Sequence, residues 1–118
     1  MGKTGLTLND IREAARRIEP YIFRTPLLRE SGMDEVLGCK VYLKPEMLQI
    51  SGAFKMRGAV NKIYSLTQEE RDKGIICSSS GNHGKACALA GKMTGTRVIV
   101  VLPEDAPKAK VEGIKQLG

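Results

Sequence analysis

The chain has few aromatic side chains and no long apolar stretch. Its 118 residues include no tryptophan, three tyrosines and two phenylalanines. Five aromatic residues are too few for the stacking platforms that bind single-stranded nucleic acids, so the net charge of +6 indicates a solvated surface with affinity for small anions. No apolar run is longer than five residues, as in Val98 to Leu102, whereas a membrane-spanning helix needs about 20. The first residues also lack the apolar stretch of a secretory signal. We therefore expect no nucleic-acid or membrane partner and a cytoplasmic location.

Metal ligands are scarce as well. Histidine occurs once, at His83, and the three cysteines, Cys39, Cys77 and Cys87, are odd in number and lack the close spacing of a zinc site. This pattern predicts no metal site and cysteines that stay reduced.

What is present is the composition of a globular protein, with an alternation of strand and helix patterns. The chain is 42% hydrophobic and long enough for one domain. Apolar runs at residues 41–44, 75–79 and 97–102 predict strands, and the β-branched run of the last predicts a buried strand. Helical patterns lie between them. The sequence therefore predicts an α/β protein whose three strands form one parallel sheet with right-handed crossovers.

Several helices carry start signals or one apolar face. Thr7 with Asp10, and Thr67 with Glu70, each form the pattern of a capping box. Three further helices are expected, the first of them beginning near Ser51. Their inward residues are expected to be Met56, Ala59, Val60 and Ile63 in the first, Ala86, Leu89, Ala90 and Met93 in the second, and Val111, Ile114 and Leu117 in the last.

Residues 51–59 place a lysine, Lys55, in the first turn of an expected helix, beside Phe54 and between two glycines. Unpaired amides at a helix start carry partial positive charge, which favours a neutral amine, and desolvation has the same effect. A neutral lysine is the form that condenses with an aldehyde. From these residues alone, an ordinary solvated lysine is the more common outcome.

A second segment, Cys77 to Gly84, connects an expected strand to an expected helix. In open α/β folds, ligands bind at this carboxyl end of a strand. Serine hydroxyls, bare amides and a helix N-terminus suit a carboxylate or a phosphate, and a tight turn whose glycines only allow close packing is the alternative. The segment lacks the Gly-x-Ser-x-Gly pattern of serine hydrolases and both common nucleotide-binding patterns, so it predicts neither of those sites.

Both segments resemble those of a known family. Lys44 to Glu46, Gln49, Ser51 to Ala59 and Asn61 resemble the lysine motif of the fold-type II pyridoxal-phosphate enzymes, and Ser79 to Gly84 resembles their asparagine loop. The match is to the branch of threonine/serine dehydratases and serine racemases, and segments 24–27 and 102–108 are similar too. The resemblance implies the parallel-sheet α/β fold of that group, which is like that of tryptophan synthase β and is incomplete in this chain.

The resemblance also implies a role for each matching residue. Lys55 would form an imine with the aldehyde of pyridoxal 5'-phosphate and later act as a base, with Phe54 packed beside the cofactor. Asn82 would hydrogen-bond the 3-oxygen of the pyridine ring. Ser80 would also be catalytic, because it aligns with the serine that serine racemases use as their second acid and base. The residues that bind the substrate carboxylate would be Ser79, Ser80, Gly81, Asn82 and His83.

The implied activity is the dehydration and deamination of L-threonine or L-serine to a 2-oxo acid and ammonia. This is a lyase reaction of amino acid metabolism, including isoleucine biosynthesis. A serine racemase, or a related dehydratase of β-hydroxy amino acids, is the alternative within the family. A non-catalytic α/β module that binds a small anion is the alternative from another class. The small amino acid is the expected substrate, and the full-length enzyme is expected to be a homo-oligomer.

The resemblance further divides the chain into two parts. Residues 1–66 would begin a large domain that carries the cofactor lysine, and residues 67–118 would begin a smaller mobile domain. In that case the strand at 41–44 need not share a sheet with the two later strands. Ala53 stands where relatives commonly have serine, so a hydroxyl near the cofactor is lost. The family's glycine-rich phosphate loop comes later in the chain, and we expect this stretch alone to be inactive.

Overall fold

The computed structural model describes residues 5–117 and begins with helix α1 (Leu8–Ile18). The capping box predicted at its start is confirmed. The amide of Asp10 donates to the Thr7 hydroxyl (3.2 Å), and the amide of Thr7 donates to the Asp10 carboxylate (2.8 Å). The helix ends before Pro20, which lies in a 3-10 turn, η1 (Glu19–Tyr21).

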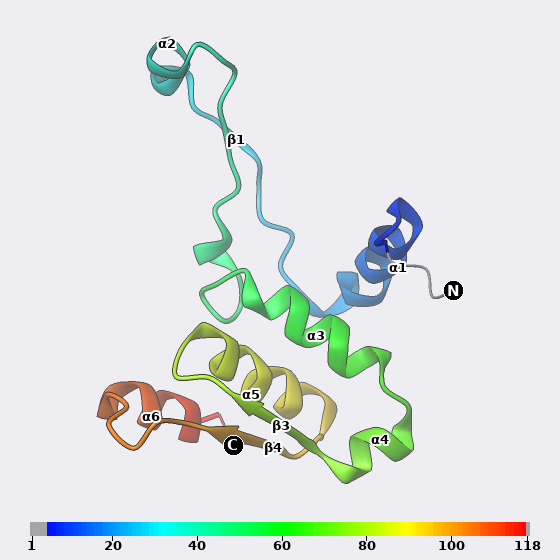
Figure 1. Ribbon diagram of the computed structural model, residues 1–118. Helices are drawn as coiled ribbons and strands as arrows, with labels where there is room; N and C mark the ends of the chain where they lie inside the picture. Colours follow the sequence, from blue (N-terminus) through cyan, green and yellow to red (C-terminus); the bar gives the residue numbers. More distant parts are fainter. Residues whose placement is uncertain (1–4, 118) are drawn as a thin grey trace.

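An arm follows that extends away from the rest of the molecule (Figure 1). Part-way along it lies a two-stranded antiparallel pair, β1 (Leu28–Arg29) and β2 (Tyr42–Leu43). Between these strands lie η2 (Ser31–Met33) and the short helix α2 (Asp34–Leu37). After them comes η3 (Glu46–Leu48).

The prediction of a single parallel sheet is therefore wrong. The strand predicted at residues 41–44 is β2, which is shorter than predicted. It pairs with β1 rather than with the two later strands. Side chains within the arm favour this pairing, because Arg29 pairs with Asp34 and donates to the Val41 carbonyl (3.0 Å). The alternative that follows from the family resemblance, in which this strand belongs to a separate sheet, is the one observed.

The rest of the chain alternates helix and strand. It contains α3 (Lys55–Ser65), α4 (Gln68–Lys73), β3 (Ile75–Ser78), α5 (Asn82–Thr94), β4 (Val98–Val101) and α6 (Lys108–Lys115). Strands β3 and β4 are parallel, with Ile75 opposite Val98. The second predicted capping box is also confirmed, since Thr67 and Glu70 exchange hydrogen bonds at the start of α4.

Helix α3 begins at Lys55, four residues after the predicted start. Gly52 has a φ of +77°, a left-handed conformation that does not continue into a right-handed helix. The Ser51 hydroxyl donates to the Ala53 carbonyl (3.2 Å), which holds the chain in a turn. Lys55 is therefore the first helical residue.

The hydrophobic core lies mainly between α3 and α5, which pack side by side (Figure 1). Tyr64 of α3 also stacks on Tyr21, with ring centroids 3.8 Å apart. Met93, near the end of α5, is 38% exposed, so the prediction that it points inward is wrong. The buried core residues are Ile18, Met56, Ala59, Val60, Ile63, Ala86, Cys87 and Ala90.

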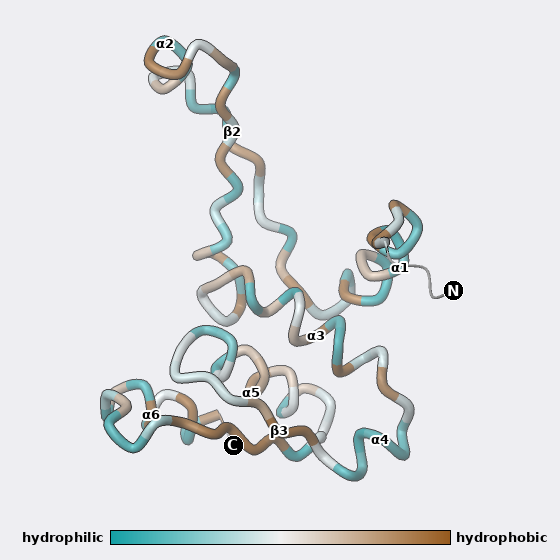
Figure 2. The backbone as a smooth tube through the Cα atoms, in the orientation of Figure 1, coloured by the Kyte–Doolittle hydropathy of each residue, from teal (hydrophilic) through white to brown (hydrophobic). Residues whose placement is uncertain are grey.

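The β3–β4 sheet is covered on one face only within residues 5–117. Helix α5 packs on the face that carries Ile75, Cys77 and Val98. On the other face Ile76 is 71% exposed, and Figure 2 shows the strands as a continuous apolar stretch. The predicted buried strand therefore alternates in exposure, because the described chain supplies no layer for its second face. Among the described residues, no helix is long and apolar enough to cross a bilayer.

Candidate active site

The turn between β3 and α5 lies at the carboxyl end of the parallel strands, as predicted. The amide of Ser79 donates to the Val101 carbonyl (3.1 Å), which ties the turn to the end of β4. The amide of Gly81 donates to the Ser79 hydroxyl (3.2 Å). These two bonds hold the turn against the sheet edge where ligands bind in such folds.

The first turn of α5 leaves backbone donors available. The amide of Lys85 donates to the Gly81 carbonyl (3.2 Å), but within residues 5–117 the amides of Asn82, His83 and Gly84 have no acceptor. The cap residue is a glycine and offers no side-chain oxygen to them. Such a helix start attracts an anion, through its free N–H groups and the partial positive charge of the helix end.

Gly84 allows this helix start to approach the strand end closely. A Cβ atom at Gly84 would lie 2.7 Å from the Ser79 carbonyl oxygen and 3.0 Å from Cγ1 of Val100. Any larger residue would push α5 away from the turn. The alternative prediction, that the glycines serve close packing, is therefore confirmed for Gly84 and is compatible with anion binding by the neighbouring amides.

A cavity of about 230 Å³ opens between the start of α5 and helix α6. Its lining includes three of the residues expected to bind the substrate carboxylate, namely Ser80, Gly81 and Asn82. Lys85 and Lys110 add positive charge to its walls. Ser79, His83, Phe54 and Lys55 do not line this cavity.

Lys55 occupies the start of the neighbouring helix. Its side chain is exposed, and Nζ lies 5.2 Å from the centroid of the Phe54 ring, which is itself 58% exposed. Helices α3 and α5 run side by side in the same direction (Figure 1). Lys55 is the first residue of α3 and Asn82 is the first residue of α5, so the two residues begin adjacent helices. No hydrogen bond joins the two groups within the described chain, so the expected site is present as two separate halves.

A partly buried polar network supports the turn before Lys55, and no sequence pattern assigned it a role. Arg57 donates to both carboxylate oxygens of Glu46 (2.8 and 2.7 Å), and the buried Thr25 hydroxyl donates to one of them (2.6 Å). Hydrogen bonds from Arg57, together with that from Thr25, lower the pKa of Glu46 from 4.5 to about 2 despite its partial burial. The Lys44 ammonium donates to the Thr25 carbonyl (2.6 Å). The only prior signal was that Lys44, Glu46 and Arg57 belong to the lysine motif and that Thr25 lies in the similar segment 24–27.

Gln49 connects the same turn to the segment after α1. Its side chain is buried, accepts from the Phe23 amide and donates to the Phe23 carbonyl, each at 2.8 Å. Glu46, Gln49 and Arg57 of the lysine motif therefore act by positioning, since they hold the chain that leads into α3.

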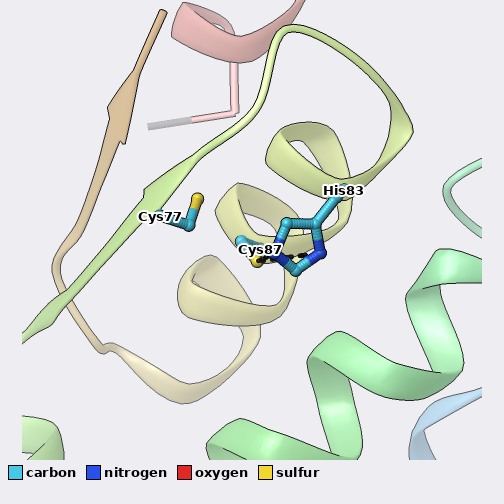
Figure 3. A group of neighbouring side chains, drawn as sticks. All are labelled: Cys77, His83 and Cys87. Atoms are coloured by element: carbon cyan, nitrogen blue, oxygen red, sulfur yellow. Dashed lines mark hydrogen bonds between the residues drawn. The ribbon is translucent and has the colours of Figure 1, made fainter.

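Two of the three cysteines, which lack the spacing of a zinc motif along the chain, lie close together in the structure. Cys77, His83 and Cys87 come together between β3 and α5, with their ligand atoms all within 4.8 Å of one another (Figure 3). All three cysteines are free thiols in the structure. Burial raises the pKa of Cys87 to about 12, and the nearby Cys77 adds to this effect.

The residues at the starts of α3 and α5 are suited to form part of the wall of a pyridoxal-phosphate site. Lys55 offers an accessible amine beside an exposed aromatic ring, and the side-chain amide of Asn82 makes no hydrogen bond within residues 5–117. The amides at the start of α5 suit the carboxylate of an amino acid that reacts with the cofactor.

Comparisons with known proteins agree with this fit. The model of the pyridoxal-phosphate dependent enzyme family matches residues 18–118. A serine racemase of Dictyostelium discoideum is 50% identical over 109 residues, which are 92% of this chain and 34% of the relative. An L-threonine ammonia-lyase of Thermotoga maritima is 43% identical over 113 residues, which are 96% of this chain and 28% of the relative.

Solved structures show the same relationship. The crystal structure of the Dictyostelium discoideum serine racemase superimposes with a TM-score of 0.91 at 50% identity, over 96% of this chain and 37% of that one. The chain thus spans about a third of the length of the relatives it matches. Its α/β fold is that of the fold-type II enzymes, the cofactor of its family is pyridoxal phosphate, and the chain belongs to the family of pyridoxal-phosphate dependent enzymes.

Proposed function

We propose that the protein is a lyase that removes water and ammonia from L-threonine or L-serine and releases a 2-oxo acid. The observation that carries this proposal is the pairing of an anion-binding helix start at Asn82 with an accessible lysine at the start of the adjacent helix. The likeness to threonine ammonia-lyases and serine racemases supports it. When bound, the cofactor supplies an electron sink for loss of the α-proton.

The residues of this chain then divide the work. The amides of Asn82, His83 and Gly84, with the hydroxyls of Ser79 and Ser80, bind the substrate carboxylate at the start of α5. Lys55 would hold the cofactor, and its amine would serve as the base that removes the α-proton from one face of the substrate. Phe54 would exclude water beside it, and the side-chain amide of Asn82 would donate a hydrogen bond to the oxygen of the cofactor ring.

The division at residues 66 and 67, the cytoplasmic location and assembly as a homo-oligomer remain predictions. In the structure α3 and α5, which the division assigns to different domains, share one core.

The proposal is tested at Lys55. In the purified full-length protein with pyridoxal phosphate, borohydride reduction is expected to fix the cofactor on the peptide that contains Lys55, as read by mass spectrometry. Lys55→Ala is expected to lose this adduct together with formation of 2-oxo acid from L-threonine and L-serine. The matched control is Lys62→Ala, an exposed lysine two turns along the same helix, which keeps both. An adduct that persists in Lys55→Ala would overturn the assignment, and cofactor-independent anion binding without an adduct would favour the non-catalytic module.

Serine racemase is the second candidate, and Ser80 is the observation that favours it. Its side chain lines the cavity beside Asn82 and makes no hydrogen bond within residues 5–117. Lys55 can serve only one face of the α-carbon, so racemisation needs a proton donor on the other face. Ser80→Ala is expected to suppress racemisation of serine far more than dehydration of L-serine, measured side by side by chiral chromatography and 2-oxo acid release. Equal losses would make Ser80 a binding residue only.

A further inference from the structure

Two thiols and one imidazole lie close together between β3 and the first turns of α5. Cys77 projects from β3 toward α5, His83 lies in the first turn of α5, and Cys87 follows one turn later (Figure 3). The spacing of four residues puts His83 and Cys87 on the same face of the helix. None of these features depends on the proposed lyase activity.

The distance between Cys87 and His83 matches the ligand separation of a tetrahedral zinc site. Zinc binds thiolate sulfur at about 2.3 Å and imidazole nitrogen at about 2.1 Å, so a sulfur and a nitrogen ligand stand about 3.6 Å apart at the tetrahedral angle. Sγ of Cys87 lies 3.6 Å from Nε2 of His83 and 3.8 Å from Nδ1. Sγ of Cys77 completes a set in which all ligand atoms lie within 4.8 Å. Small shifts of these side chains would place one ion at bonding distance from all three.

The chemistry of the ligand set selects the ion. Two sulfurs and one imidazole are ligands that suit Zn²⁺, whereas Mg²⁺ and Ca²⁺ prefer oxygen, and the group contains no carboxylate. Three protein ligands leave a fourth position for a water molecule.

We propose that Cys77, His83 and Cys87 bind one Zn²⁺ ion. Two Zn–S bonds and one Zn–N bond form, and each thiol releases its proton to solvent, so two protons leave for each ion bound. The ion joins β3 to the first turn of α5 and thereby holds the backbone next to Asn82. Zinc occupancy is then a means of regulating the turn that carries the free amides.

The test uses the purified protein, stripped of metal with a chelator and kept reduced with a phosphine. Titration with Zn²⁺ by calorimetry is expected to show one ion bound per chain. Titration with Co²⁺ is expected to show the charge-transfer absorption of a thiolate ligand, which reports on sulfur coordination directly. Cys77→Ser and His83→Gln should each lower the affinity for Zn²⁺ by about 100-fold or more.

Cys39→Ser is the matched control, because Cys39 is the exposed cysteine outside the cluster and its loss should leave binding unchanged. Cys87 lies in the core, so Cys77→Ser and His83→Gln carry the test if a Cys87 variant fails to fold. Circular dichroism establishes that each variant is folded. The proposal is overturned if no zinc binds, if binding survives Cys77→Ser, or if Cys77 and Cys87 are joined in a disulfide when zinc is available.

Discussion

Among single residues, Glu46 has the most unusual surroundings. Its carboxylate receives two hydrogen bonds from Arg57 and one from Thr25, and so connects three segments that converge on the turn before Lys55. The pair is partly buried, with 17% of the Glu46 side chain and 31% of the Arg57 side chain exposed. Breaking one partner of such a pair leaves the other without compensation, so the cost exceeds that of a surface ion pair.

Glu46→Gln is expected to lower the free energy of unfolding by on the order of 2 kcal/mol at neutral pH. Because the pKa of Glu46 is lowered from 4.5 to about 2 in the folded state, its stabilisation is present above pH 4.5 and is lost as the pH falls toward 2. Denaturant unfolding across this range should show a loss in the native protein that Glu46→Gln lacks. Glu104→Gln, at an exposed carboxylate, is the control and should follow the native curve. Identical curves for native protein and Glu46→Gln would contradict the role of the pair.

The residues that could be predicted are those whose role is local or shared with a family. Lys55 and Asn82 were found through their motifs, and each does stand at a helix start. The network of Thr25, Glu46 and Arg57 joins residues that lie 11 to 32 positions apart, so no local pattern could show it. The cluster of Cys77, His83 and Cys87 was missed because its spacing follows a strand and a helix packed together, and not a zinc motif along the chain.

At the scale of elements, the starts of the two helices with capping boxes were predictable, and the start of α3, which has no side-chain cap, was not. Both capping boxes were predicted from four residues each and are present. Helix α3 has no side-chain cap, and its start depends on the left-handed conformation of Gly52 and on the network around Glu46. Both features form only in the folded chain, so the sequence pattern placed the start of α3 four residues too early.

Thr67→Ala is expected to destabilise the protein by about 1 kcal/mol, because the Glu70 amide loses its acceptor at the start of α4. Helix α4 leads directly into β3, so fraying there also reaches the sheet edge. Thr67→Ser keeps the hydroxyl and should retain most of the stability, as measured by thermal unfolding. A Ser variant as unstable as the Ala variant would show that the methyl group of Thr67, and not its cap, is responsible.

At the scale of the whole molecule, the separation into two sheets followed from the family resemblance and not from the strand pattern. Three apolar runs of similar length carry no information on which of them pair. The later strands also alternate in exposure, although β4 is uniformly apolar and β3 is apolar except at Ser78, because α5 covers only one of their faces within residues 5–117. An unbroken β-branched run therefore indicated a strand but not its burial.

This one-sided packing predicts different costs for the same substitution at two positions of β4. Val98 packs against the core beneath α5, whereas Val101 is 50% exposed on the other face. Val98→Ala is expected to lower the free energy of unfolding by about 1 to 2 kcal/mol, through lost burial and the space it leaves. Val101→Ala is expected to cost about 0.5 kcal/mol or less, as at other exposed positions. Both variants remove the same two methyl groups from one strand, so differences in strand propensity cancel and the comparison reports on packing alone. Equal costs in denaturant unfolding would contradict the arrangement, since they would mean that the second face of the sheet is packed as closely as the first.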